Sequence, residues 1–105
     1  MRLKAMYKDF ITYQLAEGIS EAHLLKVAGD IRESWMKKQA GFISWDIHKN
    51  TGDNARYTDI ILWQSKKYAK NPEKEMVNIP NAGAWFSCHK EGSISSQNLQ
   101  QRSAF

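Results

Sequence analysis

The chain has 105 residues, of which 42% are hydrophobic and 25% are charged, and this composition is typical of one small globular domain. Its formal charge is +4, but the basic residues are spread from Arg2 to Arg102 with acidic residues between them. Nucleic-acid binding needs a basic stripe or patch, so nucleic acid is excluded as the expected partner. We expect a single domain over residues 1–105, with its core at about 10–99 and a flexible tail at 100–105.

The sequence also lacks the signals of membranes and metal sites. No apolar run approaches the roughly 20 residues that a membrane helix requires, and the first ten residues, MRLKAMYKDF, lack the long apolar core of a signal peptide. Cys88 is the single cysteine, and no two histidines share a metal-binding spacing with a carboxylate. We therefore expect a cytoplasmic protein that contacts no membrane and uses no metal or other cofactor.

The first part of the chain predicts a strand followed by an amphipathic helix. β-branched and aromatic residues cluster in FITYQL, residues 10–15, and Gly18 closes this run. Ser20 is a suitable N-cap residue, and Glu21 would meet the positive end of the helix dipole. Apolar residues then recur at helical spacing until Gly41 and form a stripe that suits packing on a sheet: Leu24, Val27, Ala28, Ile31 and Trp35.

The stretch GFISWDIHKNTGDNARYTDIILW, residues 41–63, predicts a β-hairpin with its turn at residues 50–55. We expect a register in which Asp46 lies opposite Asp59, because it separates a more apolar face from a mixed one. The predicted helix-covered face contains Ile43, Trp45, Ile47, Thr58, Ile60 and Leu62. The opposite face contains Phe42, Ser44, Asp46, His48, Tyr57, Asp59, Ile61 and Trp63. In this register Trp45 should contribute more to stability than Trp63.

The second of these faces is too polar for an ordinary core and too aromatic for a plain solvent-exposed surface. A second copy of the sheet could cover it, and the space between two such faces would have the character of a small-ligand site. A chain of this length buries a modest fraction of its surface, which also favours self-association. We therefore expect a homodimer that binds an apolar or aromatic small molecule.

The rest of the chain predicts a segmented helical region and a last strand. Ser65 could cap a helix, Pro72 either kinks that helix or restarts it, and Pro80 breaks it again. After Gly92, the stretch SISSQNL, residues 93–99, predicts a weak final strand. The order strand, helix, strand, strand, helix, strand indicates an α+β, ferredoxin-like βαββαβ fold with an antiparallel four-stranded sheet.

Three motifs, QAGFISWDIHK, YTDIILWQSKKYA and GSISSQNL, occur in this order and resemble those of the dimeric α+β barrel proteins related to the antibiotic biosynthesis monooxygenases. The resemblance covers roughly residues 10–99 and mostly records the fold. It implies a homodimer in which two sheets meet, with a pocket between each sheet and its helices or in the barrel interior. Members of this group include cofactor-independent oxygenases of aromatic polyketides, haem-degrading enzymes and proteins of unknown activity, so the resemblance leaves the chemistry open.

A haem-degrading activity is the least favoured of these alternatives. Trp63 lies where the haem-degrading relatives carry a functional tryptophan. Those relatives also have an asparagine on the first strand and a histidine on the helix that follows the tryptophan. This sequence instead has Thr12 and Gln14 on the strand, and Lys70 and Asn71 on the helix.

The candidate catalytic residues are Asp46, His48 and Asp59. Two neighbouring carboxylates raise at least one pKa if they are buried, which would suit a general base, whereas at an exposed rim they would simply be solvated. His48 could act as an acid or base, or hydrogen-bond across a dimer. The candidate pocket-lining residues are Phe42, Ser44, Tyr57, Ile61, Trp63, Trp85 and His89. Two functions fit this site: a cofactor-independent monooxygenase, and a non-catalytic dimeric protein that binds a ligand or is purely structural.

Overall fold

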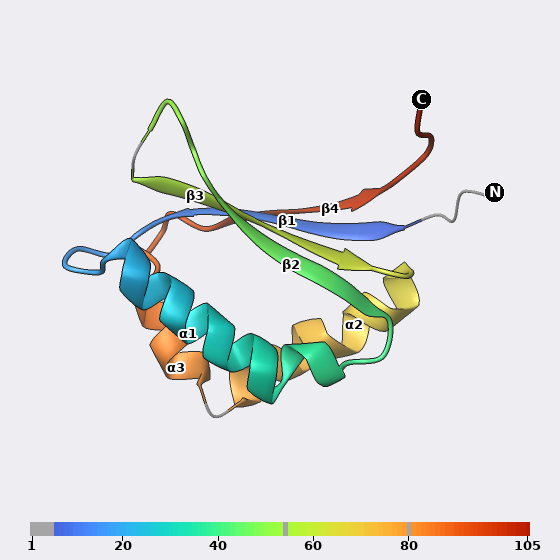
Figure 1. Cartoon of the computed structure of the whole chain (residues 1–105), viewed down its shortest axis with the longest axis horizontal. Helices are drawn as coiled ribbons and strands as arrows, with labels where there is room; N and C mark the ends of the chain where they lie inside the picture. Colours follow the sequence, from blue (N-terminus) through green and yellow to red (C-terminus); the bar gives the residue numbers. More distant parts are fainter. Residues whose placement is uncertain (1–5, 54, 80) are drawn as a thin grey trace.

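The computed structural model describes residues 6–53, 55–79 and 81–105, and it places a layer of helices on one face of a four-stranded sheet (Figure 1). The sheet order is β2-β3-β1-β4, and its neighbouring strands are antiparallel. The predicted α+β ferredoxin-like fold is therefore confirmed. In chain order the elements are β1 (Tyr7–Gln14), α1 (Glu21–Ser34), η1 (Met36–Lys38), β2 (Phe42–Lys49), β3 (Arg56–Trp63), α2 (Lys66–Glu75), η2 (Met76–Asn78), α3 (Ala82–Ser87) and β4 (Ser95–Gln100), where η denotes a short 3-10 helix.

The first elements follow local signals in the sequence. The Ser20 side chain accepts a hydrogen bond from the His23 backbone N–H at 3.1 Å, which confirms Ser20 as the N-cap of α1. Strand β1 begins at Tyr7, three residues before the predicted start. The extension places Tyr7 and Asp9 on the buried face of the sheet, where they are 6% exposed each. This difference in strand start matters for the site.

The second half of the chain is segmented as predicted, but Pro72 does not restart the helix. Pro72 lies inside α2, and the helix changes to a 3-10 turn at Met76. Strand β4 includes Gln100, which had been assigned to the tail. Asn54 of the predicted turn and Pro80, the predicted helix breaker, lie outside the described residues. Within the described ranges, no helix combines the length and apolar character needed to cross a bilayer.

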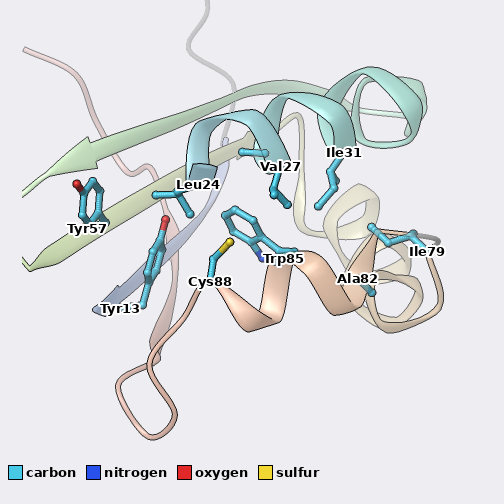
Figure 2. Packing of buried hydrophobic residues seen from close by; sticks show 10 residues of the cluster. Tyr13, Leu24, Val27, Ile31, Tyr57, Ile79, Ala82, Trp85 and Cys88 are labelled. Carbon is cyan, nitrogen blue, oxygen red and sulfur yellow. The ribbon is translucent and has the colours of Figure 1, made fainter. Parts of the chain in front are cut away.

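The core lies between α1, α3 and the sheet. Leu24 and Ile31 of α1 are fully buried and, together with Val27, point toward Trp85 of α3 (Figure 2). Each such buried side chain stabilises the fold by about 1.5–3 kcal/mol relative to an exposed position. The apolar stripe predicted for α1 is therefore a packing surface. The other face of the sheet carries no helix (Figure 1).

The register of the β2–β3 hairpin differs by one residue from the predicted one. Asp46 lies opposite Ile60, and Asp59 lies opposite Ile47. Because side chains alternate along a strand, this one-residue difference moves every β3 side chain to the other face. The predicted β3 faces are therefore wrong. The helix-covered face carries the buried residues Tyr57, Asp59, Ile61 and Trp63, and the open face carries Thr58, Ile60 and Leu62.

On β2, Trp45 and Ile47 face the helices as predicted, but Ile43 does not. The ladder is irregular between Phe42 and Ser44, and Ile43 in this bulge is 40% exposed. Phe42 instead packs edge-on against Trp63, with ring centroids 5.7 Å apart. The bulge thus brings Phe42 to the helix-covered face. Regular alternation along β2, as predicted, would have placed Phe42 on the other face.

Aromatic side chains on β3 explain why this register is preferred. The observed register buries Trp63 and Tyr57, which remove more apolar area from water than the threonine and isoleucine that the predicted register would bury instead. Their polar ends also find partners under the helices: the Trp63 indole N–H donates to Asp9 at 3.1 Å, and the Tyr57 hydroxyl donates to Glu21 at 2.7 Å. The mixed face is therefore the one that the helices cover.

Candidate active site between the sheet and the helices

A cavity of about 290 Å³ lies between the helix-covered face of the sheet and the helices. All four tryptophans of the chain line it: Trp35, Trp45, Trp63 and Trp85. Its volume is at the lower end of the range for small-molecule pockets, which is about 300–1,000 Å³. Four indole rings provide walls suited to a flat aromatic ligand.

The cavity opens between η2, α3 and the segment that precedes β4. Three apolar residues that line it are also exposed to solvent: Val77 is 64% exposed, Phe86 is 42% exposed and Ile94 is 49% exposed. These three residues form an apolar rim at the mouth. A ligand can therefore reach the interior from solvent between these elements.

Asp59 is a buried carboxyl in this cavity, with only 1% of the residue exposed. The Tyr13 hydroxyl donates a hydrogen bond to Asp59 Oδ1 at 2.8 Å. Among the described residues, Asp59 Oδ2 and the Trp45 indole Nε1 are both buried without a hydrogen-bond partner. Burial raises the pKa of Asp59 to about 7, although Tyr13 and the nearby Trp45 indole act in the opposite direction.

Asp9 is a second buried carboxyl in the same cavity. It accepts the hydrogen bond from Trp63 through Oδ2, while its Oδ1 is buried with no donor in reach among the described residues. Burial, followed by the negative charge of Glu73 and a hydrogen bond between the two carboxyls, raises the pKa of Asp9 to about 7. Asp9 and Asp59 lie diagonally across β1 and β3, because Asp9 is opposite Ile61 and Asp59 is opposite Ile11. Diagonal neighbours on one face of a sheet are about 7–8 Å apart.

His89 adds an imidazole beside these carboxyls. Its ring packs against Tyr13 and Trp85, with centroid distances of 4.2 and 4.5 Å. The residue is 8% exposed, and within the described chain both ring nitrogens are buried without a hydrogen-bond partner. Burial lowers the pKa of His89 to about 4, so the ring is neutral at pH 7.

The arrangement can transfer protons near neutral pH. A carboxyl with a pKa of about 7 is ionised in a large fraction of molecules at pH 7, yet it is basic enough to remove an acidic proton. The apolar aromatic walls lower the local dielectric and so strengthen each electrostatic interaction in the cavity. In the described residues, no group of three or more histidine, cysteine or acidic side chains is arranged to hold a metal ion.

The structure brings together only part of the predicted site. The predicted residues that line the cavity are Asp59, Ile61, Trp63, Trp85 and His89. Phe42 and Tyr57 also lie on the helix-covered face but do not line the cavity.

Three predicted site residues lie on the other face of the sheet. Asp46 and His48 are exposed on β2, and Ser44 shares their face. The predicted pairing of Asp46 with Asp59 is therefore wrong, because the one-residue register difference separates these carboxylates by the thickness of the sheet.

Sequence reasoning missed Asp9, Glu73 and two of the tryptophans as cavity residues. The signal for Asp9 was present: Tyr7, Asp9, Ile11 and Tyr13 alternate along β1 and share its buried face. A carboxylate flanked by aromatic residues at this period is a candidate buried acid. The predicted strand start at residue 10 removed Asp9 from that pattern.

Comparison with solved structures finds the same fold in several proteins. SnoaB, a cofactor-independent oxygenase from Streptomyces nogalater, has a TM-score of 0.77 at 12% identity, over 95% of this chain and 96% of SnoaB. The monooxygenase ActVA-Orf6 of Streptomyces coelicolor, in complex with nanaomycin D, has a TM-score of 0.66 at 16% identity, over 96% of this chain and 91% of that one. PA3566 from Pseudomonas aeruginosa has a TM-score of 0.61 at 13% identity, over 98% and 100% of the two chains.

These likenesses show that the chain has the α+β fold of the antibiotic biosynthesis monooxygenase-like proteins, as the sequence motifs predicted. No protein-family model matches the sequence, and no curated protein matches it significantly. At identities of 12–16% the fold is shared without the activity following from it.

Proposed function

We propose that the protein is a cofactor-independent monooxygenase that oxidises a small phenolic aromatic compound in the tryptophan-lined cavity. The observation that carries this proposal is the pair of buried carboxyls, Asp9 and Asp59, inside a cavity walled by four indole rings. The fold shared with oxygenases such as SnoaB is consistent with it.

Asp59 is the residue to which we assign the role of general base. It removes the phenolic proton, and the resulting phenolate is electron-rich enough to react with O₂ at a ring carbon. One oxygen atom enters the ring, the other leaves as water, and the phenol becomes a quinone. Asp59 suits this step better than His89, because its pKa of about 7 makes it the stronger base of the two.

The Tyr13 hydrogen bond has a positioning role in this scheme. It holds Asp59 Oδ1 at 2.8 Å and leaves Oδ2 unpaired on the same buried carboxyl. The indoles of Trp45 and Trp63 would hold the substrate ring, since flat aromatic groups stack on or against one another with favourable energy. Exclusion of water by the aromatic walls would protect the reactive phenolate.

The proposal predicts that Asp59→Asn lowers turnover of the best substrate in a panel of naphthols and naphthohydroquinones. Loss of a general base typically lowers the rate by about 10²–10⁴-fold. Oxygen uptake measures turnover, and quenching of the four cavity tryptophans measures binding independently of chemistry. Binding should change little, because asparagine keeps the shape of the side chain.

Two comparisons make this experiment decisive. Asp30→Asn is the matched control, because Asp30 is exposed on α1 and pairs only with Lys26 at the surface. If Asp46→Asn abolishes turnover and Asp59→Asn does not, the site lies on the open face of the sheet. If no panel member quenches the tryptophans or consumes oxygen, the monooxygenase proposal is wrong, and tight binding without turnover would support the ligand-binding alternative.

We also propose that the protein is a homodimer that pairs through the open face of the sheet. This face carries Phe10 opposite Ile60, and Lys8 between Leu62 and Leu99. These residues alternate along β1 and β3 with those of the helix-covered face, so they belong to the face that carries no helix in Figure 1 and that an isolated chain leaves open to water. The interface expected from the sequence was the mixed face that contains Asp46 and Trp63. The helices cover the β3 part of that face, so we propose the open face instead.

We expect the wild-type chain to sediment as a dimer at micromolar concentration. Ile60→Lys should shift it to monomer, because a charge on a buried interface between two sheets would lack a partner. Leu25→Lys is the control, since Leu25 is 47% exposed on α1, in the helix layer on the opposite side of the sheet from the proposed interface. A wild-type monomer at tens of micromolar would contradict the proposed interface.

A further inference from the structure

The ionisable side chains that line the cavity are acidic or neutral. Asp9, Asp59 and Glu73 are the carboxyl groups, and His89 is the imidazole. Among the residues that the structure describes, no lysine or arginine lines the cavity. An anionic ligand would therefore meet only like charges there, while a cationic one would meet opposite charges.

These carboxyls also lack counter-ions from the protein. The ion pairs found among the described residues lie on the surface of α1 and η1, and none involves Asp9, Asp59 or Glu73. Their hydrogen bonds come from neutral donors, the Tyr13 hydroxyl and the Trp63 indole. A buried carboxylate without a cation is unfavourable, and a ligand that supplies the positive charge would relieve this cost.

Asp9 and Glu73 place two of these carboxyls close together. Glu73, on α2, lines the cavity together with Asp9 on β1, and burial, the charge of Glu73 and a hydrogen bond between the two carboxyls raise the pKa of Asp9. Asp9 is 6% exposed, and no donor in the described part of the chain reaches its Oδ1. Once both carboxyls are ionised, neither can donate a hydrogen bond to the other, so the partner that the pair then lacks is a donor.

We infer that the substrate class is an aromatic compound that carries a protonated amine, with the ammonium group bound between Asp9 and Glu73. The indole faces add to this preference, because tryptophan is the strongest cation–π partner among the aromatic side chains. The inference rests on the proposed function for the second half of the ligand, the phenol that Asp59 deprotonates. The two groups would then lie at the diagonal separation of Asp9 and Asp59, about 7–8 Å.

Three probes with the same aromatic body test the charge preference without any turnover: 1-naphthylmethylamine, 1-naphthylmethanol and 1-naphthoate. Calorimetric titration of the wild-type protein at pH 8 should show the amine binding at least about tenfold more tightly than the alcohol. The carboxylate should bind weakest of the three. Equal affinities, or an alcohol that binds more tightly than the amine, would overturn the inference.

Paired variants locate the ammonium site. Asp9→Asn and Glu73→Gln should each reduce the preference for the amine over the alcohol. Glu73→Gln should leave folding intact, because Glu73 is exposed on α2. Asp30→Asn is the control and should keep the full preference, since Asp30 lies on the surface of α1. If Glu73→Gln and Asp9→Asn both keep that preference, the ammonium group does not bind between them.

The pH dependence gives a second readout. Burial raises the pKa values of Asp9 and Asp59 to about 7, so these two carboxyls gain protons between pH 8 and pH 6. Affinity for the amine should then fall while affinity for the neutral alcohol stays constant. The naphthyl probes lack a phenol, so their binding order tests this inference separately from turnover. If the protein prefers the amine but no phenol causes oxygen uptake, the result would support this inference and contradict the monooxygenase proposal.

Discussion

Replacing Trp63 with alanine is expected to lower the free energy of unfolding by about 3–5 kcal/mol, as is usual when a large buried aromatic side chain is truncated. Trp63 is 1% exposed and packs in a cluster with Tyr7, Met36 and Ile61. Its loss would enlarge the existing cavity and would leave Asp9 without its one hydrogen-bond donor among the described residues. Both effects act in the same direction.

Urea unfolding of Trp63→Ala, Trp63→Phe and Trp45→Ala measures these contributions. Trp63→Phe keeps most of the buried ring and loses the N–H, so it should cost less than Trp63→Ala. Trp45 is partly exposed and its indole N–H makes no hydrogen bond within the described residues, so Trp45→Ala should also cost less. The hairpin register inferred from the sequence predicted instead that Trp45→Ala would cost more stability than Trp63→Ala. A larger loss for Trp45→Ala would therefore contradict the observed face assignment.

The order of elements could be predicted because each element has a strong local signal. The Ser20 cap, the α1 stripe and the alternation in both hairpin strands depend on residues close together in sequence. The same holds for the family resemblance, whose motifs record the strands of the fold. The helical region after Ser65 was correctly expected to be segmented, although Pro72 and Gly83 lie inside α2 and α3 and the described change from α2 to a 3-10 turn occurs at Met76.

The hairpin register could not be predicted as reliably as the order of the elements. Both faces of β3 carry large apolar groups, so alternation alone accepts either face as the buried one. A long turn at residues 50–55 does not fix the pairing as a two-residue turn would. The deciding contacts are tertiary: Tyr57 reaches Glu21 on α1, and Trp63 reaches Asp9 on β1. Neither pair is visible as a pattern in one segment.

The candidate site was affected by this same error. Asp59, Trp63 and His89 line the cavity, whereas Asp46 and His48, which the wrong register grouped with them, lie on the other face of the sheet. Glu73 gave no signal, because an acidic residue on a polar helix is ordinarily solvated. Its relation to Asp9 depends on how α2 packs against the sheet.

The second large effect concerns pH: Asp59→Asn is expected to make the protein more stable than the wild type at pH 8. The pKa of Asp59 is about 7 in the folded protein, against 3.8 for the unperturbed group. Between these values the folded state binds more protons than the unfolded state, so wild-type stability falls as pH rises from about 4 to about 7 and then levels off. Asparagine does not titrate and removes this contribution.

Each unit of pKa difference corresponds to about 1.4 kcal/mol, so the full window is expected to change stability by a few kcal/mol. Urea unfolding at pH 5, 6, 7 and 8 measures the difference between Asp59→Asn and wild type, which should grow in favour of the variant with pH. Asp9 contributes a slope of the same sign and remains in both proteins. Asp30→Asn, which removes an exposed carboxyl on α1, is the control.

A constant difference for Asp59→Asn across this range would mean that Asp59 is not held in a dry environment, and its role as a base near neutral pH would fail with it. A difference that grows with pH would instead mean that Asp59 is held away from water. A carboxyl that weakens the folded state at neutral pH, and that asparagine could replace without loss of shape, is difficult to explain by packing alone. Its presence would be explained if the proton that it exchanges belonged to the proposed reaction in the cavity. The same substitution should therefore stabilise the fold at pH 8 and slow turnover there.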